Sequence, residues 1–428
     1  MIPVTLILLV LFIGLGLPVA ASMGLLGVAL SKTYSFLPLT YAIGDVAWMT
    51  STSFILLAIP LYIMMGEVLL RSGMAERMYG AMSCWLSWLP GGLMHSNFAS
   101  CGLFAATSGT SVATAATVGT VAIPEIERHG YDRRIFLGTL AAGGTVGILI
   151  PPSTNMILYG LLTDTSIPKL YLAGFVPGAL LVALFMATTL LVCRIYPAAR
   201  GRRVTFTWAE RWRALPAFLA PMTIFLLVVG SIYAGVATPA ESGALGLAAS
   251  LALAARHGRL DWPMLRAAIL GSMRTTAMSM ALLVAAYFLN FVIGSIGLTR
   301  AINDLVVGLG LTPYALLLMV VVFYFVLGMF MDTLTMMVAT VPIIAPTVFA
   351  AGFDAVWFGV IMMLLIEVAM ITPPVGLNLF VIQSIRDKGE IDDVIVGVLP
   401  YVATMLLFIA LITIFPGIVL FAPGLIAN

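Results

Sequence analysis

Charged side chains are scarce in this chain of 428 residues: Asp, Glu, Lys and Arg make up only 9% of it, against about 25% in a soluble globular protein. Hydrophobic residues account for 62%, and the mean hydropathy is +1.13. So few polar residues could not cover the surface of a soluble fold of this size. The composition therefore predicts an all-α polytopic membrane protein. Long unbroken apolar runs exclude a β-barrel, whose strands alternate apolar and polar residues.

Cysteine and histidine are also rare, with three of each. Cys84, Cys101 and Cys193 are scattered through apolar sequence, and their spacing fits neither a disulfide framework nor a zinc site. The histidines are too few and too dispersed to hold a metal. A net charge of +2 leaves no electrostatic footprint for nucleic acid. We therefore expect no cofactor, no nucleic-acid partner and no metal centre beyond alkali cations.

Apolar runs divide the chain into segments of membrane length, about 20 residues or more. They cover residues 2–30, 52–70, 81–104, 135–162, 170–193, 217–255, 277–296, 304–330, 355–385 and 393–420. The first has no positively charged start, so it is predicted to be a retained span rather than a signal peptide. Two further stretches, about 105–126 and 331–351, are interrupted by Ser, Thr, Gly and Pro. These two are candidates for re-entrant hairpins.

The sequence repeats itself at one constant offset, the separation between Pro124 and Pro346. The other pairs that coincide at this offset are Gly130 and Gly352, Asp132 and Asp354, Phe136 and Phe358, and Pro151-Pro152 and Pro373-Pro374. Internal repeats of this kind are typical of secondary transporters.

We assign 1–200 to a first repeat, with a hairpin at about 105–126 and a broken helix at 135–162. We assign 201–428 to a second repeat, with a hairpin at about 331–351 and a broken helix at 355–385. Each repeat has five spanning segments and one hairpin, and an odd number of crossings predicts that the repeats are inverted.

The loop 194–213 sets the expected orientation, because it holds six of the twenty Lys and Arg residues and belongs in the cytoplasm by the positive-inside rule. A single crossing by 217–255 would then place the four arginines between 256 and 274 outside, against that rule. Two crossings would remove the conflict and destroy the inversion. We favour the inversion and expect 259–275 to be an amphipathic helix in the membrane interface.

Two proline pairs predict broken helices. In GILIPPSTN (147–155) and AMITPPVGLN (369–378), the prolines remove backbone donors and clash with the preceding turn, so each helix must break within the membrane. Lipid cannot satisfy the freed backbone groups, which must face protein or a polar cavity. Matched breaks in two repeats indicate a transporter binding site. The polar residues beside them, Ser153, Thr154, Asn155 and Asn378, are the expected substrate contacts.

The hairpin candidates supply oxygen ligands. SGTSVATAATVGT (108–120) carries small hydroxylated residues, which can provide hard oxygens for an alkali cation and equally can pack helices closely. In GMFMDTLTMMVATVP (328–342), Asp332 is an ionisable group inside an apolar run, a functional candidate by default, and Thr333, Thr335 and Thr340 add oxygens.

Three other acids lie in or near apolar sequence. Glu67 precedes Arg71 by four residues, which favours a helical ion pair. Glu241 follows a proline and fits the first turn of a helix. Glu367 lies just before the second break and is a weaker functional candidate.

Together the motifs predict a mechanism. Half-helix N-termini would direct partial positive charge at an anionic substrate, while unwound carbonyls and hydroxyls hold sodium. Sodium is favoured over protons because hydroxyls and carbonyls are plentiful at these motifs and buried acids are few. Each net charge that crosses gains ~2.3 kcal/mol per 100 mV, so a dianion needs at least three sodium ions before the membrane potential drives its uptake.

These motifs, in the order SGTSVATAATVG, AIPEIERHGYD, GILIPPS, GMFMDTLTMMVATVPIIAP and ITPPVGLNLFV, resemble the large membrane subunit of tripartite ATP-independent periplasmic (TRAP) transporters over about residues 1–420. The resemblance implies an elevator-type, sodium-driven importer of organic acids such as C4-dicarboxylates and sialic acid, in the bacterial inner membrane. It implies two partners: a small four-helix membrane subunit, expected as a separate chain, and a periplasmic substrate-binding protein.

The resemblance also implies where sodium binds. It places the ions at the hairpin residues Ser108, Gly109, Thr110 and Ser111, at the break Pro151, Pro152 and Ser153, at Asp332, Thr333 and Thr335, and at the break Thr372, Pro373, Pro374 and Gly376. Many members carry Asp where this chain has Thr114 and Asn where it has Leu365, so the ion ligands differ in detail.

Three other functions are alternatives to this interpretation of the sequence. A single-component anion symporter would need no binding protein, but such proteins carry Ser-Asn-Thr signatures at the hairpins, and none stands at these hairpins. An intramembrane enzyme would need a catalytic pair, for which His95 beside Ser96 is the only hint, so we expect no enzyme. A channel would conduct without a binding protein.

Overall fold

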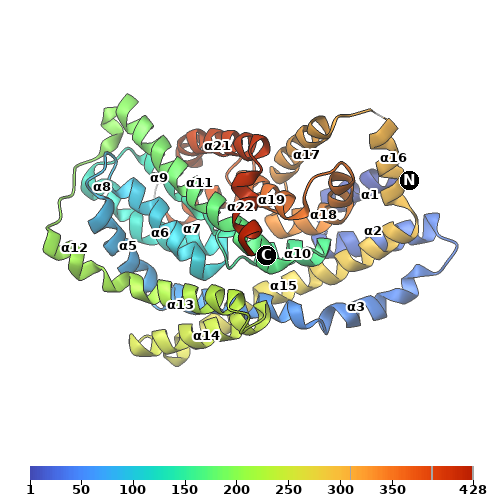
Figure 1. Ribbon diagram of the computed structural model, residues 1–428, viewed down its shortest axis with the longest axis horizontal. Helices are drawn as coiled ribbons and strands as arrows, with labels where there is room; N and C mark the ends of the chain where they lie inside the picture. Colours follow the sequence, from blue (N-terminus) through green and yellow to red (C-terminus); the bar gives the residue numbers. More distant parts are fainter. Residues whose placement is uncertain (309, 387–388, 427–428) are drawn as a thin grey trace.

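The computed structural model describes residues 1–308, 310–386 and 389–426, and every regular element in those ranges is a helix (Figure 1). The prediction of an all-helical membrane protein is confirmed. Six helical stretches of the described chain are long and apolar enough to cross a membrane. They are Phe54–Arg71, Ile167–Ile195, Trp208–Tyr233, Trp262–Ser295, Thr333–Ala350 and Ile391–Ile414.

Four predicted spans are interrupted, because glycine and proline break them locally. The run 2–30 turns at Gly16 (φ 73°), 81–104 at Pro90-Gly91-Gly92, 217–255 at Gly235 (φ 69°) and 304–330 near Gly310 (φ 61°). Their pieces are α1 (Ile2–Gly14) and α2 (Val19–Tyr34), α5 (Met74–Leu86) and α6 (Leu93–Ser108), α13 (Pro216–Tyr233) and α14 (Pro239–Arg256), and α16 (Leu298–Gly308) and α17 (Pro313–Gly328). None of these four runs is therefore a single continuous helix.

The helix expected at 259–275 begins at Trp262 but does not end near residue 275. These residues lead into α15 (Trp262–Ser295), which continues for 34 residues because 272–293 contains neither glycine nor proline. The start of α13 and the end of α14 lie together, since Arg213, Pro216 and His257 line one pocket with Arg77. The basic end of α14 is therefore on the same side of the molecule as the arginine-rich loop, which removes the conflict with the positive-inside rule.

The helices recur at the same offset as the sequence motifs. Helix α7 (Ser111–Ala122) and helix α18 (Thr333–Ala350) begin at positions that this offset relates, and so do α9 (Arg133–Thr145) and α19 (Ala355–Met370). The aspartates cap equivalent helices: Asp132 accepts from Ile135 N at 3.1 Å and Asp354 from Trp357 N at 2.8 Å. Helices α11 (Ile167–Ile195) and α21 (Ile391–Ile414) follow at similar places.

Each repeat contains a helix-turn-helix at the expected hairpin, but its arms start earlier than expected. The first is α6–α7 with its turn at 109–110, and the second is α17–α18 with its turn at 329–332. The predicted ranges 105–126 and 331–351 contain the second arms but leave out most or all of the first arms. The first arms were assigned to spans because they are apolar.

Both proline pairs break their helices. After α9 the chain passes through a short 3-10 turn, η3 (Val146–Ile148), and the cis Pro151-Pro152 bond into α10 (Thr154–Thr163). After α19 it passes through the cis Pro373-Pro374 bond into α20 (Leu377–Ile385).

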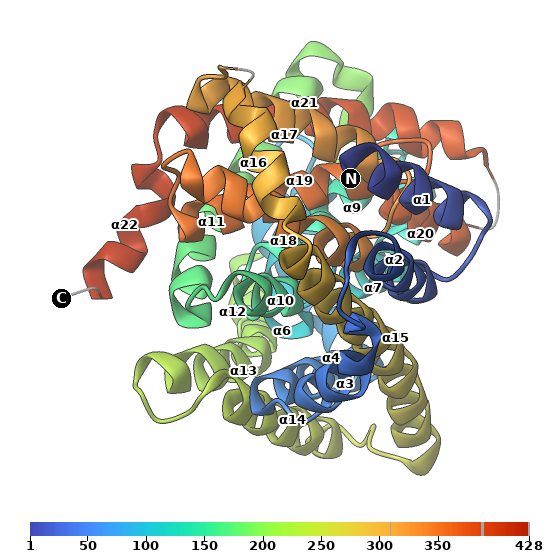
Figure 2. The same ribbon diagram turned by 90° about the vertical axis from the view of Figure 1, so that its right-hand side faces the viewer.

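The helices pack as two groups that meet along a seam. Helices α2, α4 (Ala58–Arg71), α14 and α15 pack on one another, while α9, α21, α6, α7 and α20 form the core of the other group. Figure 1 and Figure 2 show α3 (Ile43–Ser51), α13 and α14 along one edge of the molecule, away from α17 and α21. The remaining helices are η1 (Leu39–Ala42), η2 (Phe54–Leu57), α8 (Pro124–His129), η4 (Pro197–Arg200), α12 (Trp208–Ala214) and α22 (Gly417–Ile426).

The closest contact between the repeats joins α9 to α21. A Cβ at Gly138 would overlap the carbonyl oxygen of Gly397, and a Cβ at Gly397 would overlap that of Arg134. The two backbones touch only because both residues lack a side chain. Asp393 adds a polar link, since its carboxylate binds Arg134 at 3.2 Å and Arg386 at 3.1 Å.

Replacing Gly138 with alanine should destabilise the protein by about 1–3 kcal/mol, because the added methyl forces α9 and α21 apart. Gly230 in α13 is the matched control, since a Cβ there meets nothing within 4 Å. Thermal unfolding of the purified protein measures both. Equal melting temperatures for Gly138→Ala and Gly230→Ala would contradict this packing.

Candidate functional site

A cavity of about 700 Å³ lies on the seam between the two groups of helices. Helices α4 and α15 form one wall, and the hairpin turns and helix breaks form the other. Its polar lining consists of Glu67, Thr110, Ser111, Thr154, Asn155, Thr275, Ser279, Asp332 and Thr333. Two breaks and two hairpin turns, which come from opposite halves of the sequence, therefore meet at one cavity. The predicted convergence is observed.

In the first repeat, the hairpin turn rests on the break. Gly109 adopts φ 65°, and a Cβ there would come within 3.0 Å of the Pro152 carbonyl oxygen. The Thr154 hydroxyl donates to the Gly109 carbonyl at 3.4 Å. Ser153 caps α10 by accepting from Met156 N at 3.4 Å. Hairpin and break are thus held together by a close backbone approach and a hydrogen bond from the Thr154 side chain.

The second repeat has a similar but more open arrangement. Asp332 caps α18 by accepting from Thr335 N at 3.2 Å, and Val375 N of the break donates to the Met329 carbonyl of the turn at 3.2 Å. The hydroxyl of Thr372 donates back to Val368 O at 2.7 Å. Pro374 is exposed, whereas all of 151–160 is buried. The two breaks therefore differ in their access to the outside.

Asn378 connects the repeats. Its amide nitrogen donates to Ser111 Oγ at 2.8 Å and to the Ala141 carbonyl at 3.1 Å, and its amide oxygen accepts from Ser111 Oγ at 3.2 Å. Asn378 is fully buried by these contacts. The structure therefore places it behind the cavity wall, where it positions the first hairpin.

The predicted site residues divide into two sets. Those that line the cavity are Gly109, Thr110, Ser111, Thr154, Asn155, Asp332 and Thr333. Those that support it from the surrounding turns and breaks are Pro151, Pro152, Ser153, Thr335, Thr372, Pro373, Pro374, Gly376 and Asn378. The side chain of Ser108, at the end of α6, lies outside the described part of the structure.

Sequence reasoning missed the opposite wall. The predicted Glu67–Arg71 ion pair is present at 2.7 Å, but Glu67 also lines the cavity. A Cβ at Gly271 of α15 would come within 2.8 Å of the Glu67 carboxylate, so this glycine lets α15 approach it closely. Thr275 and Ser279 follow Gly271 at helical spacing on the lined face. The spacing of Gly271, Thr275 and Ser279 could have indicated a polar stripe.

Four helices begin at this cavity. The first residues of α7, α10, α18 and α20, which are Ser111, Thr154, Thr333 and Leu377, all line it. A helix N-terminus carries roughly half a positive charge and unsatisfied N–H groups. Two acids, Glu67 and Asp332, also face the space. The cavity can therefore accept an anion at helix ends and a cation at carboxylate, hydroxyl and carbonyl oxygens.

Glu241 and His95 have local structural partners. Glu241 and Thr238 form a capping box at the start of α14, as the sequence indicated. The imidazole Nε2 of His95 lies 2.9 Å from the Pro90 carbonyl oxygen, so this nitrogen is engaged with the loop and not with Ser96.

Comparison with known proteins supplies the family. Residues 6–418 match the family described as tripartite ATP-independent periplasmic transporter, DctM component. The chain is 34% identical over 366 residues to the C4-dicarboxylate TRAP transporter large permease protein DctM of Pseudomonas aeruginosa, covering 84% of both chains. It is 28% identical to the ectoine TRAP transporter large permease protein TeaC of Halomonas elongata, covering 83% of both.

Two further matches are to a longer relative and to a solved structure of low sequence identity. The chain is 32% identical over 405 residues to the isethionate TRAP transporter permease protein DctMQ of Oleidesulfovibrio alaskensis, and the match spans 92% of this chain but 62% of that relative. The crystal structure of the YdaH transporter of Alcanivorax borkumensis has a similar fold, with a TM-score of 0.61, 17% identity and coverage of 89% of this chain and 88% of YdaH. The chain is therefore a multi-pass membrane protein that belongs to the DctM component family of TRAP transporters.

Proposed function

We propose that this protein is the large permease subunit of a sodium-coupled importer for an organic acid, delivered by a periplasmic binding protein. The observation that carries the proposal is the meeting of four helix N-termini at one cavity between two groups of helices. Substrates named for relatives include C4-dicarboxylates and isethionate, both anions, and ectoine. A carboxylate fits helix N-termini by charge and by hydrogen bonding.

Sodium would bind where hairpin turns meet breaks. The first site joins 108–111 to Pro151–Ser153, and the second joins Asp332, Thr333 and Thr335 to Thr372–Gly376. Gly109 and Pro152 already lie in contact, as do Val375 and Met329. Both places concentrate carbonyl and hydroxyl oxygens, the ligands that hard cations select. An ion at either place would link a hairpin to its neighbouring broken helix.

Inverted repeats fit the observed helices once the crossings are recounted. Each repeat gains a crossing, because its first apolar run is a helix pair, α1–α2 or α13–α14. Each also loses one, because α6 and α17 are hairpin arms that return to the side they entered. The two changes offset each other, and five crossings per repeat remain, which is the odd number that inversion requires.

An elevator movement would use the seam as its sliding surface. Helices α4 and α15 face the hairpins and breaks across the cavity. The core of the opposite group contains helices of both repeats, held by the contact between Gly138 and Gly397. That group would carry the ions and the substrate across as one body, while α2, α4, α14 and α15 form the frame.

Two partners complete the proposed system in a bacterial inner membrane: a small four-helix membrane subunit and a periplasmic binding protein. Family membership supports both, since the family is described as tripartite and periplasmic. A single-component symporter is the alternative, and it would transport without the binding protein.

Reconstitution should show uptake only in the complete system. Proteoliposomes containing this chain and its small subunit should accumulate a radiolabelled organic acid when a sodium gradient and the binding protein are both present. The panel would include C4-dicarboxylates and sialic acid. Full uptake without sodium would refute the coupling, and full uptake without the binding protein would favour the single-component alternative.

Asp332→Ala and Ser108→Ala should each raise the sodium concentration needed for half-maximal uptake by about tenfold, since losing a hydrogen-bonding or charged ligand removes about 1.5 kcal/mol. Asp392→Ala is the control, because this acid is exposed at the start of α21. Sodium titration of uptake measures all three. Wild-type sodium affinity in both site variants would show that the ions bind elsewhere.

A further inference from the structure

Glu367 is a fully buried carboxylic acid to which the proposed sodium mechanism gives no role. It lies in α19, its exposed fraction is 0%, and neither carboxylate oxygen has a hydrogen-bond partner in the described chain. The backbone N–H of Leu149 faces this carboxyl but is already bonded to the Val146 carbonyl at 3.1 Å. An isolated ionised carboxylate in such a place is very unfavourable, and the group takes a neutral form or binds a cation instead.

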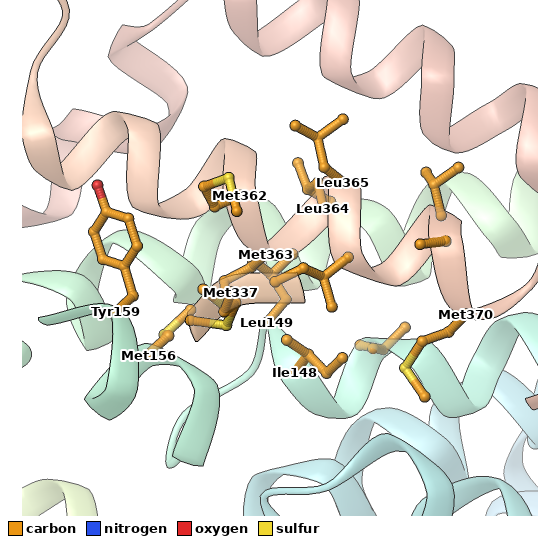
Figure 3. Close-up of a cluster of buried hydrophobic side chains, with 14 of the residues drawn as sticks. Ile148, Leu149, Met156, Tyr159, Met337, Met362, Met363, Leu364, Leu365 and Met370 are labelled. Atoms are coloured by element: carbon orange, nitrogen blue, oxygen red, sulfur yellow. The ribbon is translucent and has the colours of Figure 1, made fainter. Parts of the chain in front are cut away.

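Buried apolar side chains flank Glu367 on its own helix. Glu367 lies between Leu364 and Met370 on α19, and both side chains are buried. Figure 3 shows Met363 of α19 and Met337 of α18 facing Leu149 of the first break. Aliphatic and thioether groups offer no hard oxygen for sodium. A proton needs no such set of ligands.

No charged or titratable neighbour in the described ranges neutralises this acid. On the elements that pack against α19, four tyrosines and two charged residues are bonded to other groups: Tyr159 to Ala355 O, Tyr171 to Ser153 O, Tyr324 to Thr340, Tyr401 to Thr189, Asp332 to Thr335 N, and Arg386 to Asp393. The basic residues Arg133, Arg134, Lys169 and Arg194 are exposed at the ends of α9 and α11.

The fold itself does not require an acid here. At the equivalent position of the first repeat, Thr145 is buried and its hydroxyl donates to Ala142 O at 2.8 Å. At this position the first repeat therefore has a neutral side chain that forms a hydrogen bond within its own helix. The acid is specific to the second, more exposed break.

We infer that Glu367 is a proton-binding site that exchanges its proton with water during the transport cycle. Met370, one helical turn away, lines the cavity, and so does Leu377 beyond the break. A rearrangement of one turn at the end of α19 would connect Glu367 to the cavity. The carboxyl keeps its proton while buried, and when opened it transfers that proton to water and is left as a carboxylate. This inference rests on the proposed transport function.

The test compares wild type with Glu367→Gln, a neutral side chain of the same shape, and with Glu367→Asp, which restores a titratable group. Glu76→Gln is the control, since Glu76 is exposed on α5. Infrared spectra of the purified protein should contain a protonated-carboxyl band in wild type that Glu367→Gln lacks. Sodium-driven uptake would be followed in proteoliposomes with the small subunit and binding protein, with a pH dye trapped inside.

Wild-type uptake should fall as pH rises, by up to about tenfold per unit because one proton must rebind. Glu367→Gln should keep sodium-driven uptake with a flat pH profile and no proton movement, and Glu367→Asp should restore the pH dependence. If Glu367→Gln matches wild type in pH profile and dye signal, or if wild type lacks the carboxyl band, the inference fails while the proposed function stands. Absence of sodium-driven uptake in every variant, with binding protein present, would instead refute the proposed function.

Discussion

Backbone groups freed inside a membrane need partners within the protein, and this constraint shapes the site. Each proline pair interrupts a helix, and each break is met by a hairpin turn of the same repeat: Gly109 lies on Pro152, and Val375 N donates to Met329 O. Asn378 then ties the second break to the first hairpin through Ser111. The polar cavity follows from these contacts, because the oxygens and N–H groups left over face one shared space.

The sequence was sufficient where a residue type forces a local backbone conformation. Proline pairs predicted both breaks, and Asp132 and Asp354 marked the starts of equivalent helices, because each effect acts within a few residues. The prediction of continuous spans failed where it used hydropathy alone. An apolar run such as 217–255 looks continuous, yet Gly235 turns it and the Thr238–Glu241 capping box starts a new helix.

Other parts of the site depend on packing between distant segments, which no local pattern encodes. Glu67 formed its predicted helical ion pair, but its place in the cavity depends on α15 approaching at Gly271. Asn378 was predicted to contact substrate; in the structure its amide is engaged with Ser111 and Ala141, residues of the other repeat. The chemistry of each side chain could be predicted from the sequence, whereas the direction in which it points could not.

The bare contact between Gly138 and Gly397 also limits how this architecture can diversify. Each repeat contributes one helix whose backbone is not covered by a side chain at this contact. One repeat could therefore be replaced by that of a related protein only if the two helix surfaces still fit. A substitution at either glycine would require the backbone of the facing helix to move. The two repeats share one arrangement of helices, but this contact makes them evolve as a single unit.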